Sequence, residues 1–347
     1  MRTARIGIIF ASALALSVIA AASFASAHEV YLLSAEEIAA AKDMARMPAR
    51  VTLEENLSQF VFWAFVALVV LTTVYFMSLS RRIVNMCGPF LRRVKKYAPI
   101  VVRVGTGLAF LSFAYYGGLF GPELPLSGVY GSAAPVAGIA FALGGLALIA
   151  NVLARSVSLL LLAVAGAGAL MSGFYSFTYV EYAGALLFLA IGDGAAPARA
   201  GAARPLARVL RTLAQYRWAI LRMGLGASIM FAAVYAKVVH SALAYMVVEK
   251  YDLTSYWLFA PFEPHFLVLG AAIIEFLAGI LIFLGIEIRH TAAFVAFWLT
   301  LSMVFFREAV WPHIILFTLA GACMLYGYDR FSVFGRLYIR DGKEPVL

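Results

Sequence analysis

Two ionisable residues stand inside long apolar stretches of this sequence, and both could do chemistry. Lys237 and Glu275 are each flanked by runs of apolar residues. A charged group in such surroundings is costly and by default marks a functional site whose partner lies nearby. We expect the Lys237 ammonium and the Glu275 carboxylate to pair, and together they could bind a polar headgroup or transfer protons. In the alternative interpretation, the pair only locks two helices together.

Arginines and a histidine extend this polar set. Arg222 opens the stretch that ends near Lys237, and we group it with Lys237 and Glu275 as a candidate catalytic residue. The candidates for binding a cofactor are His313, Arg307 and Arg289.

Four of the five histidines are expected on one side of the protein, where they could bind a metal. These are His28, His240, His265 and His313. Imidazole nitrogens bind transition metals, and His28 at a processed amino terminus would add its amine, a chelating pair suited to copper. In the alternative interpretation, His265 and Trp311 are interfacial anchors, and Arg307 with Glu308 only marks the end of a helix.

The elements that position these residues are apolar enough to require lipid. Of 347 residues, 64% are hydrophobic and only 13% charged, and the mean hydropathy is +0.92. A soluble domain carries about one quarter charged residues. The net charge of +9 lies in short segments between apolar runs, which favours membrane orientation over nucleic-acid binding. The sequence contains no HExxH, CxxC or glycine-rich phosphate loop, and Cys87 and Cys323 are expected to stay reduced.

The apolar runs predict an all-α, polytopic membrane helical bundle with about nine transmembrane helices, since a spanning helix needs roughly 20 apolar residues. The expected spans are 58–80, 99–120, 135–154, 156–172, 176–192, 217–240, 266–286, 291–307 and 311–328. Lys and Arg concentrate in alternate connections, which predicts a periplasmic mature amino terminus and a cytoplasmic carboxyl terminus in the inner membrane.

The amino terminus has the pattern of a secretory signal. Arg2 and Arg5 precede the apolar stretch 6–24, and Ala25-Ser26-Ala27 is a small-x-small cleavage signature. We therefore expect a signal peptide at 1–27 and a periplasmic segment at 28–57. The span and basic loop at 58–98 follow.

An internal repeat divides the remaining chain. Arg103-Val-Gly-Thr-Gly107 opens one run of four spans and Arg222-Met-Gly-Leu-Gly226 opens another. This predicts two tandem parallel four-helix units at 99–195 and 217–330, with a cytoplasmic linker at 196–216 and a tail at 331–347. Phe141 occupies the position of Glu275 in the first unit, so we expect the first unit to be a packing scaffold and the second to carry the chemistry.

The second unit resembles the DoxX/DoxD family of small four-helix membrane proteins. The resemblance is carried by Arg222, Gly226, Lys237, Glu275, Gly279, Leu284-Gly285, Arg289 and Gly327-Tyr-Asp329. It implies a redox setting, because DoxD-like proteins are subunits of thiosulfate:quinone oxidoreductase and DoxX-like proteins associate with membrane oxidoreductase assemblies.

Three functions follow as expectations. The protein is a subunit of a quinone-linked oxidoreductase with a redox partner protein, or it handles copper through its histidines, or it is a non-catalytic membrane scaffold.

Overall fold

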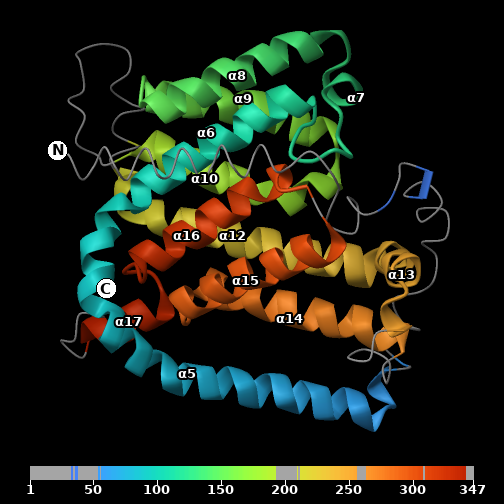
Figure 1. The fold of residues 1–347 in the computed structure, drawn as a ribbon. Helices are drawn as coiled ribbons and strands as arrows, with labels where there is room; N and C mark the ends of the chain where they lie inside the picture. The colour runs from blue at the N-terminus through green and yellow to red at the C-terminus, as the bar shows by residue number, and fades with distance from the viewer. Residues whose placement is uncertain are drawn as a thin grey trace.

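The fold is described from a computed structural model (Figure 1). The structure describes residues 56–192, 212–255, 263–307 and 309–340, together with positions 33, 36, 37, 54 and 209. The expected signal peptide and most of 28–57 lie outside the described residues.

The described residues fold into antiparallel helices and contain no strand. The long helices are α5 (Phe60–Val94), α6 (Ala98–Tyr116), α8 (Ala134–Ala150), α9 (Ala154–Met171), α10 (Val180–Ile191), α12 (Arg217–Val234), α14 (Pro264–Leu284), α15 (Ile288–Phe306) and α16 (Ile314–Tyr326). Shorter helices are α7 (Leu126–Tyr130), α13 (Ser241–Lys250) and α17 (Val333–Arg340). Within these described ranges, eight helical segments are long and apolar enough to cross a membrane, and Trp311–Tyr326 is a shorter apolar helix. The predicted helical bundle is confirmed.

The bundle has two ends, which Figure 1 separates clearly. The histidine end is formed by residues 117–133, 240–255 and 309–313, and includes α13. The arginine end is formed by residues 151–153, 285–287 and 327–332, and includes α17.

Glycine contacts hold the first two helices of each predicted unit together. A Cβ built on Gly107 would lie 2.7 Å from the Gly145 carbonyl oxygen, and one on Gly226 would lie 2.6 Å from the Gly279 carbonyl oxygen. No side chain could occupy either position without moving the helices apart. Lipid supplies no hydrophobic drive between helices, so this backbone approach provides the contact area.

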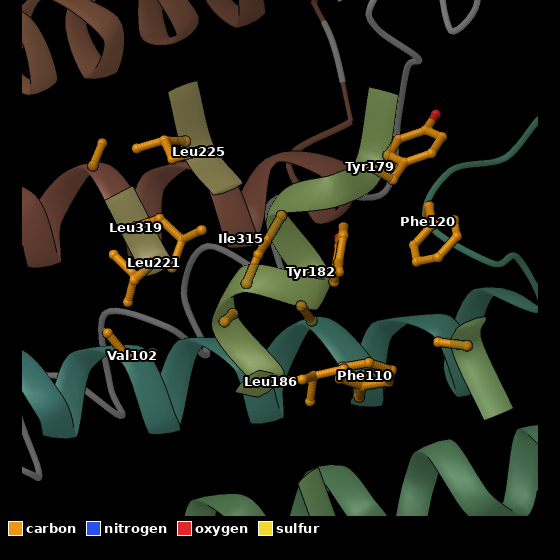
Figure 2. Packing of buried hydrophobic residues seen from close by; sticks show 14 of the residues in the cluster. Val102, Phe110, Phe120, Tyr179, Tyr182, Leu186, Leu221, Leu225, Ile315 and Leu319 are labelled. Carbon is orange, nitrogen blue, oxygen red and sulfur yellow. The ribbon is translucent and has the colours of Figure 1, made fainter. Parts of the chain in front are cut away.

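The centre of the bundle is the junction of the two predicted units. Here α10 packs on α12, and α16 packs on α6, so the last helix of each unit contacts the first helix of the other. Figure 2 shows Phe110 and Val102 of α6 with Leu186 of α10, Leu221 of α12 and Ile315 of α16 in one cluster. This buried junction is the main hydrophobic core.

The turns at the arginine end correspond in the two units. Leu153 and Glu287 precede α9 and α15 with positive φ angles of 49° and 46°. Arg155 then donates to the Ile191 carbonyl at 3.2 Å, and Arg289 donates to the Leu325 carbonyl at 3.4 Å. The two turns are alike in this respect, and the internal repeat stays a prediction.

Two local features differ from the expected helix ends. The expected loop at 81–98 is helical as far as Val94, so Cys87 lies in α5 and not in a loop. The second difference is at the end of α12, where the helix continues into a π turn at Tyr235–Val239. π turns are rare in proteins and often occur at functional sites.

Candidate functional site

Lys237 and Glu275 form a direct ion pair inside the second unit. The Lys237 Nζ lies 2.8 Å from the Glu275 Oε2, and the two side chains are 6% and 19% exposed. The expected pairing is therefore present in the structure. Its role in chemistry stays a prediction.

The π turn positions the cation of this pair. Lys237 is the third of the five residues in the turn, and its neighbour Ala236 is buried with it. A regular α-helix turns about 100° for each residue, so the wider π turn changes the direction in which Lys237 leaves the helix. The turn directs the ammonium toward α14, which carries Glu275.

Trp298 of α15 completes the site as a third polar partner. Its indole Nε1 donates to the Glu275 Oε1 at 3.4 Å, so each carboxylate oxygen has a different donor. The indole also stacks on Phe294, with ring centroids 6.0 Å apart. Three helical segments thus converge on one carboxylate. Trp298 was not among the candidate residues predicted from the sequence. In a sequence, a tryptophan within an apolar run that belongs to a site looks the same as one that anchors a helix at the membrane surface.

Glu275 is partly exposed, and the two helices around it carry aromatic residues on the apolar surface of the bundle. Glu275 is followed by Phe276, which is 41% exposed, while Phe294 and Phe297 of α15 are 39% and 61% exposed. Exposed aromatic side chains on apolar helices face lipid in a membrane protein. A hydrophobic molecule moving in the bilayer could therefore approach the carboxylate from this side.

Arg222 does not join this site, and grouping it with Lys237 was wrong. It lies 15 residues before Lys237, about 22 Å along the helix axis. Its Nε pairs with the Asp329 Oδ2 at 2.8 Å, and its Nη1 donates to the carbonyls of Ile282 and Phe283. Arg222 therefore closes the arginine end of the bundle by joining α12 to the end of α14 and to the segment after α16.

The three cofactor candidates lie at opposite ends of the bundle. Arg289 is buried at the arginine end beside Gly327, and its Nε and Nη1 have no hydrogen-bond partner among the described residues. Arg307 is exposed and ends α15 with a φ of 56°, and His313 is 2% exposed just before α16 at the histidine end. One small cofactor could not contact Arg289 and His313 together.

The described histidines do not assemble into a metal centre. His240 packs against Tyr235 with ring centroids 4.5 Å apart, and His265 Nδ1 is hydrogen-bonded to the Tyr245 hydroxyl. Within the part of the chain that the structure describes, no group of three or more His, Cys, Asp or Glu side chains could hold a metal ion. His28 lies outside the described residues.

The first unit also holds acidic residues in its interior. Glu181 in the first turn of α10 is only 2% exposed, and the half-buried Glu123 accepts a hydrogen bond from the Tyr179 hydroxyl. The role of the first unit as a packing scaffold stays a prediction. The sequence signal was present, because Glu181 falls inside the predicted span 176–192.

The family comparison agrees with the resemblance of the second unit. The DoxX family model matches residues 217–308, which include Lys237, Glu275 and Trp298. The matched segment and the apolar helices together identify an integral membrane protein with a DoxX-like domain. Comparison with curated proteins and with solved structures gave no match.

Proposed function

We propose that this protein is the membrane subunit of a quinone-linked oxidoreductase and that Lys237 and Glu275 bind the quinone headgroup. The observation that carries the proposal is the ion pair inside the DoxX-like domain, with one carboxylate partly open on an apolar, aromatic face. Quinones are apolar molecules with two polar carbonyl groups. They would reach such a site from within the bilayer.

The residues of the site fit the chemistry of a quinone. An ammonium or an indole N–H donates to a quinone carbonyl, and hydrogen bonds that involve a charged group are the stronger ones. Reduction of a quinone to a quinol takes two electrons and two protons. The Lys237 ammonium could deliver one proton to a quinone oxygen, as an N–H bond breaks and an O–H bond forms, while Glu275 holds the lysine in place. Protons from water outside the site would restore the ammonium and supply the second proton. The electrons would come from a partner protein or a diffusing reductant.

We further propose that the arginine end faces the cytoplasm. The basic residues between the predicted spans lie mainly on that side, including Arg155, Arg217, Arg289 and Arg330, and such residues are enriched in cytoplasmic connections. The inner membrane is then the location of the protein, and the histidine end faces the periplasm. A periplasmic reductant or partner would approach the histidine end.

Binding of a short-chain quinone analogue to the purified full-length protein tests the proposal. A hydrogen bond to a charged group contributes about 1.5–3 kcal/mol, so Glu275→Gln and Lys237→Met should each raise Kd roughly 10- to 100-fold. Glu249→Gln is the matched control, because this glutamate is exposed on α13. Equal Kd values for the wild type and both site variants would refute the proposal. If both variants also retained cellular function, the pair would be a helix lock in a scaffold.

Electron transfer is the second measurement. Purified protein with its co-purifying partners should reduce the quinone when thiosulfate is added, and Glu275→Gln should slow the reaction. The absence of reduction with every co-purified fraction would count against a role in this reaction.

A further inference from the structure

A stack of aromatic and basic side chains lies at the arginine end, where α16 meets the start of α12. Tyr326, the last residue of α16, stacks on Trp218 of α12, with ring centroids 3.7 Å apart and 12° between the ring planes. The Lys95 Nζ lies 4.2 Å from the centroid of the Tyr326 ring, and the Arg217 Cζ lies 5.7 Å from that of Trp218. A cation is attracted to an aromatic face at such distances. Two basic residues thus share one stacked pair of rings.

A second stack of the same kind follows directly from the first. Tyr216 precedes Arg217 in the chain, and its ring stacks on Phe331 with centroids 4.5 Å apart. The Arg330 Cζ lies 4.6 Å from the Phe331 ring centroid, and its guanidinium also donates to the Gln215 side chain. Arg330 is exposed. The second stack therefore adds an accessible cation close to the first.

Both stacks lie where membrane-spanning helices leave the hydrocarbon. Tyr326 ends the apolar helix Trp311–Tyr326, and the candidate spans Lys95–Tyr116 and Ala214–Val239 begin at this end. Aromatic side chains are enriched at the membrane–water interface, and long basic side chains extend from there to the headgroups. The stacked cations are thus held at the depth of the lipid phosphates.

The exposed charge of this end has one sign. In addition to the stacked cations, Arg93, Lys96 and Arg336 are exposed. Among the described residues of this end the acidic side chains are Glu287 and Asp329, which are 4% and 7% exposed, and Asp329 is already in an ion pair. A basic surface beside a membrane attracts anionic lipids.

We propose that the two stacks form a binding site for the headgroup of an anionic phospholipid. The Lys95 ammonium and the guanidinium groups of Arg217 and Arg330 would donate to the phosphate oxygens, and an arginine can bind a phosphate through two N–H groups. The aromatic rings restrict these cations before the lipid arrives, so binding orders fewer side chains. A free phosphate could make the same contacts, but it has no acyl chains to hold it at this depth.

The lipid would join elements that are distant in the sequence. Lys95 lies just before α6 of the first unit, whereas Arg217 and Arg330 lie at the start and after the end of the second. The site is separate from the proposed quinone site, because Arg217 lies 20 residues before Lys237, about 30 Å along the helix axis. Binding of the lipid would therefore stabilise the junction of the two units without contacting the Lys237–Glu275 pair.

Native mass spectrometry of the purified full-length protein, released from detergent micelles, tests the site. Phosphatidylglycerol is the probe, and phosphatidylcholine with the same acyl chains is the comparison, because its headgroup has a phosphate but no net charge. The wild type should retain phosphatidylglycerol preferentially, and this preference should fall as the ammonium acetate concentration rises. A wild type that retains both lipids equally would overturn the proposal.

Three variants assign the binding to the stacks. Lys95→Gln and Arg217→Gln each remove one cation and should each raise the apparent Kd for phosphatidylglycerol roughly fivefold, whereas Lys95→Arg should keep the wild-type value. Arg307→Gln is the matched control, because it removes one exposed cation from the histidine end, and it should leave the Kd unchanged. Wild-type Kd values for both site variants, or an equal increase in the control, would refute the site.

Two further outcomes distinguish the lipid from other anions. Inorganic phosphate in excess should not displace phosphatidylglycerol, and displacement at equal concentration would show a site for free phosphate instead. If the site variants kept the lipid but lost a co-purifying acidic protein, the surface would be a protein interface and the proposal would be wrong. No quinone enters these measurements, so failure of the proposed function would leave their result interpretable.

Discussion

The energy of the Lys237–Glu275 pair can be measured with a double-mutant cycle. Removing one partner of a buried pair typically costs about 3–5 kcal/mol, because the other charge is left uncompensated. Glu275 is 19% exposed and keeps the hydrogen bond from Trp298, so Lys237→Met should lower the free energy of unfolding by about 3 kcal/mol, at the lower end of that range. Glu275→Gln removes the carboxylate that pairs with the Lys237 ammonium, which is 6% exposed, and this change should cost about as much.

The double variant Lys237→Met/Glu275→Gln separates pairing from packing. It leaves no buried charge at the site, so it should cost about 3–4 kcal/mol, close to either single variant and well below the sum of the two, with a coupling energy of about 2–3 kcal/mol. Reversible unfolding in mixed micelles, followed by far-UV circular dichroism, gives the three differences. If the two single effects added to the double effect within about 0.5 kcal/mol, the pair would contribute no interaction energy and our reasoning about the site would be refuted.

Three further predictions concern other contacts. Gly226→Ala should destabilise the bundle by about 1–3 kcal/mol, because the added Cβ meets the backbone of α14. A Cβ on Gly321 would have no atom within 4 Å, so Gly321→Ala should be nearly neutral in the same unfolding assay. Equal effects of the two changes would contradict the packing argument. Arg222→Ala removes the cation that pairs with the buried Asp329 and should cost about 3–5 kcal/mol of stability. The folded fraction of this variant should bind a quinone analogue with an unchanged Kd. A raised Kd would show that Arg222 contributes to the binding site. Trp298→Phe removes one donor to Glu275 and should weaken binding of the analogue roughly tenfold at little cost in stability, and an unchanged Kd would exclude the indole from binding.

The helices were predictable because the membrane imposes a strict length and polarity on them. Each predicted span overlaps a helix of the structure, and a short turn at 151–153 separates α8 from α9, with Arg155 as the second residue of α9. The end of α5 was not predictable in the same way. Residues beyond the hydrocarbon can continue a helix or leave it, and in this chain the helix continues to Val94.

The partner of a buried charge could be predicted from the sequence only where one residue of opposite charge stood out within the same unit. Lys237 and Glu275 were the obvious pair within the second unit. Arg222 has its partner more than 100 residues later at Asp329, and only the folded chain brings the segment after α16 back to α12. Glu181 was missed although it falls inside the predicted span 176–192, because no motif of the first unit drew attention to it.

The π turn also makes the site sensitive to chain length. Such a turn holds one residue more than the α turn it replaces, so the loss of Ala236 would allow Tyr235–Val239 to close into a regular helix. Lys237 would then rotate by about 100° relative to the preceding part of α12, away from Glu275. A single deletion would separate the two charges while leaving both residues in the sequence, so their presence in a related chain would not by itself preserve the pair.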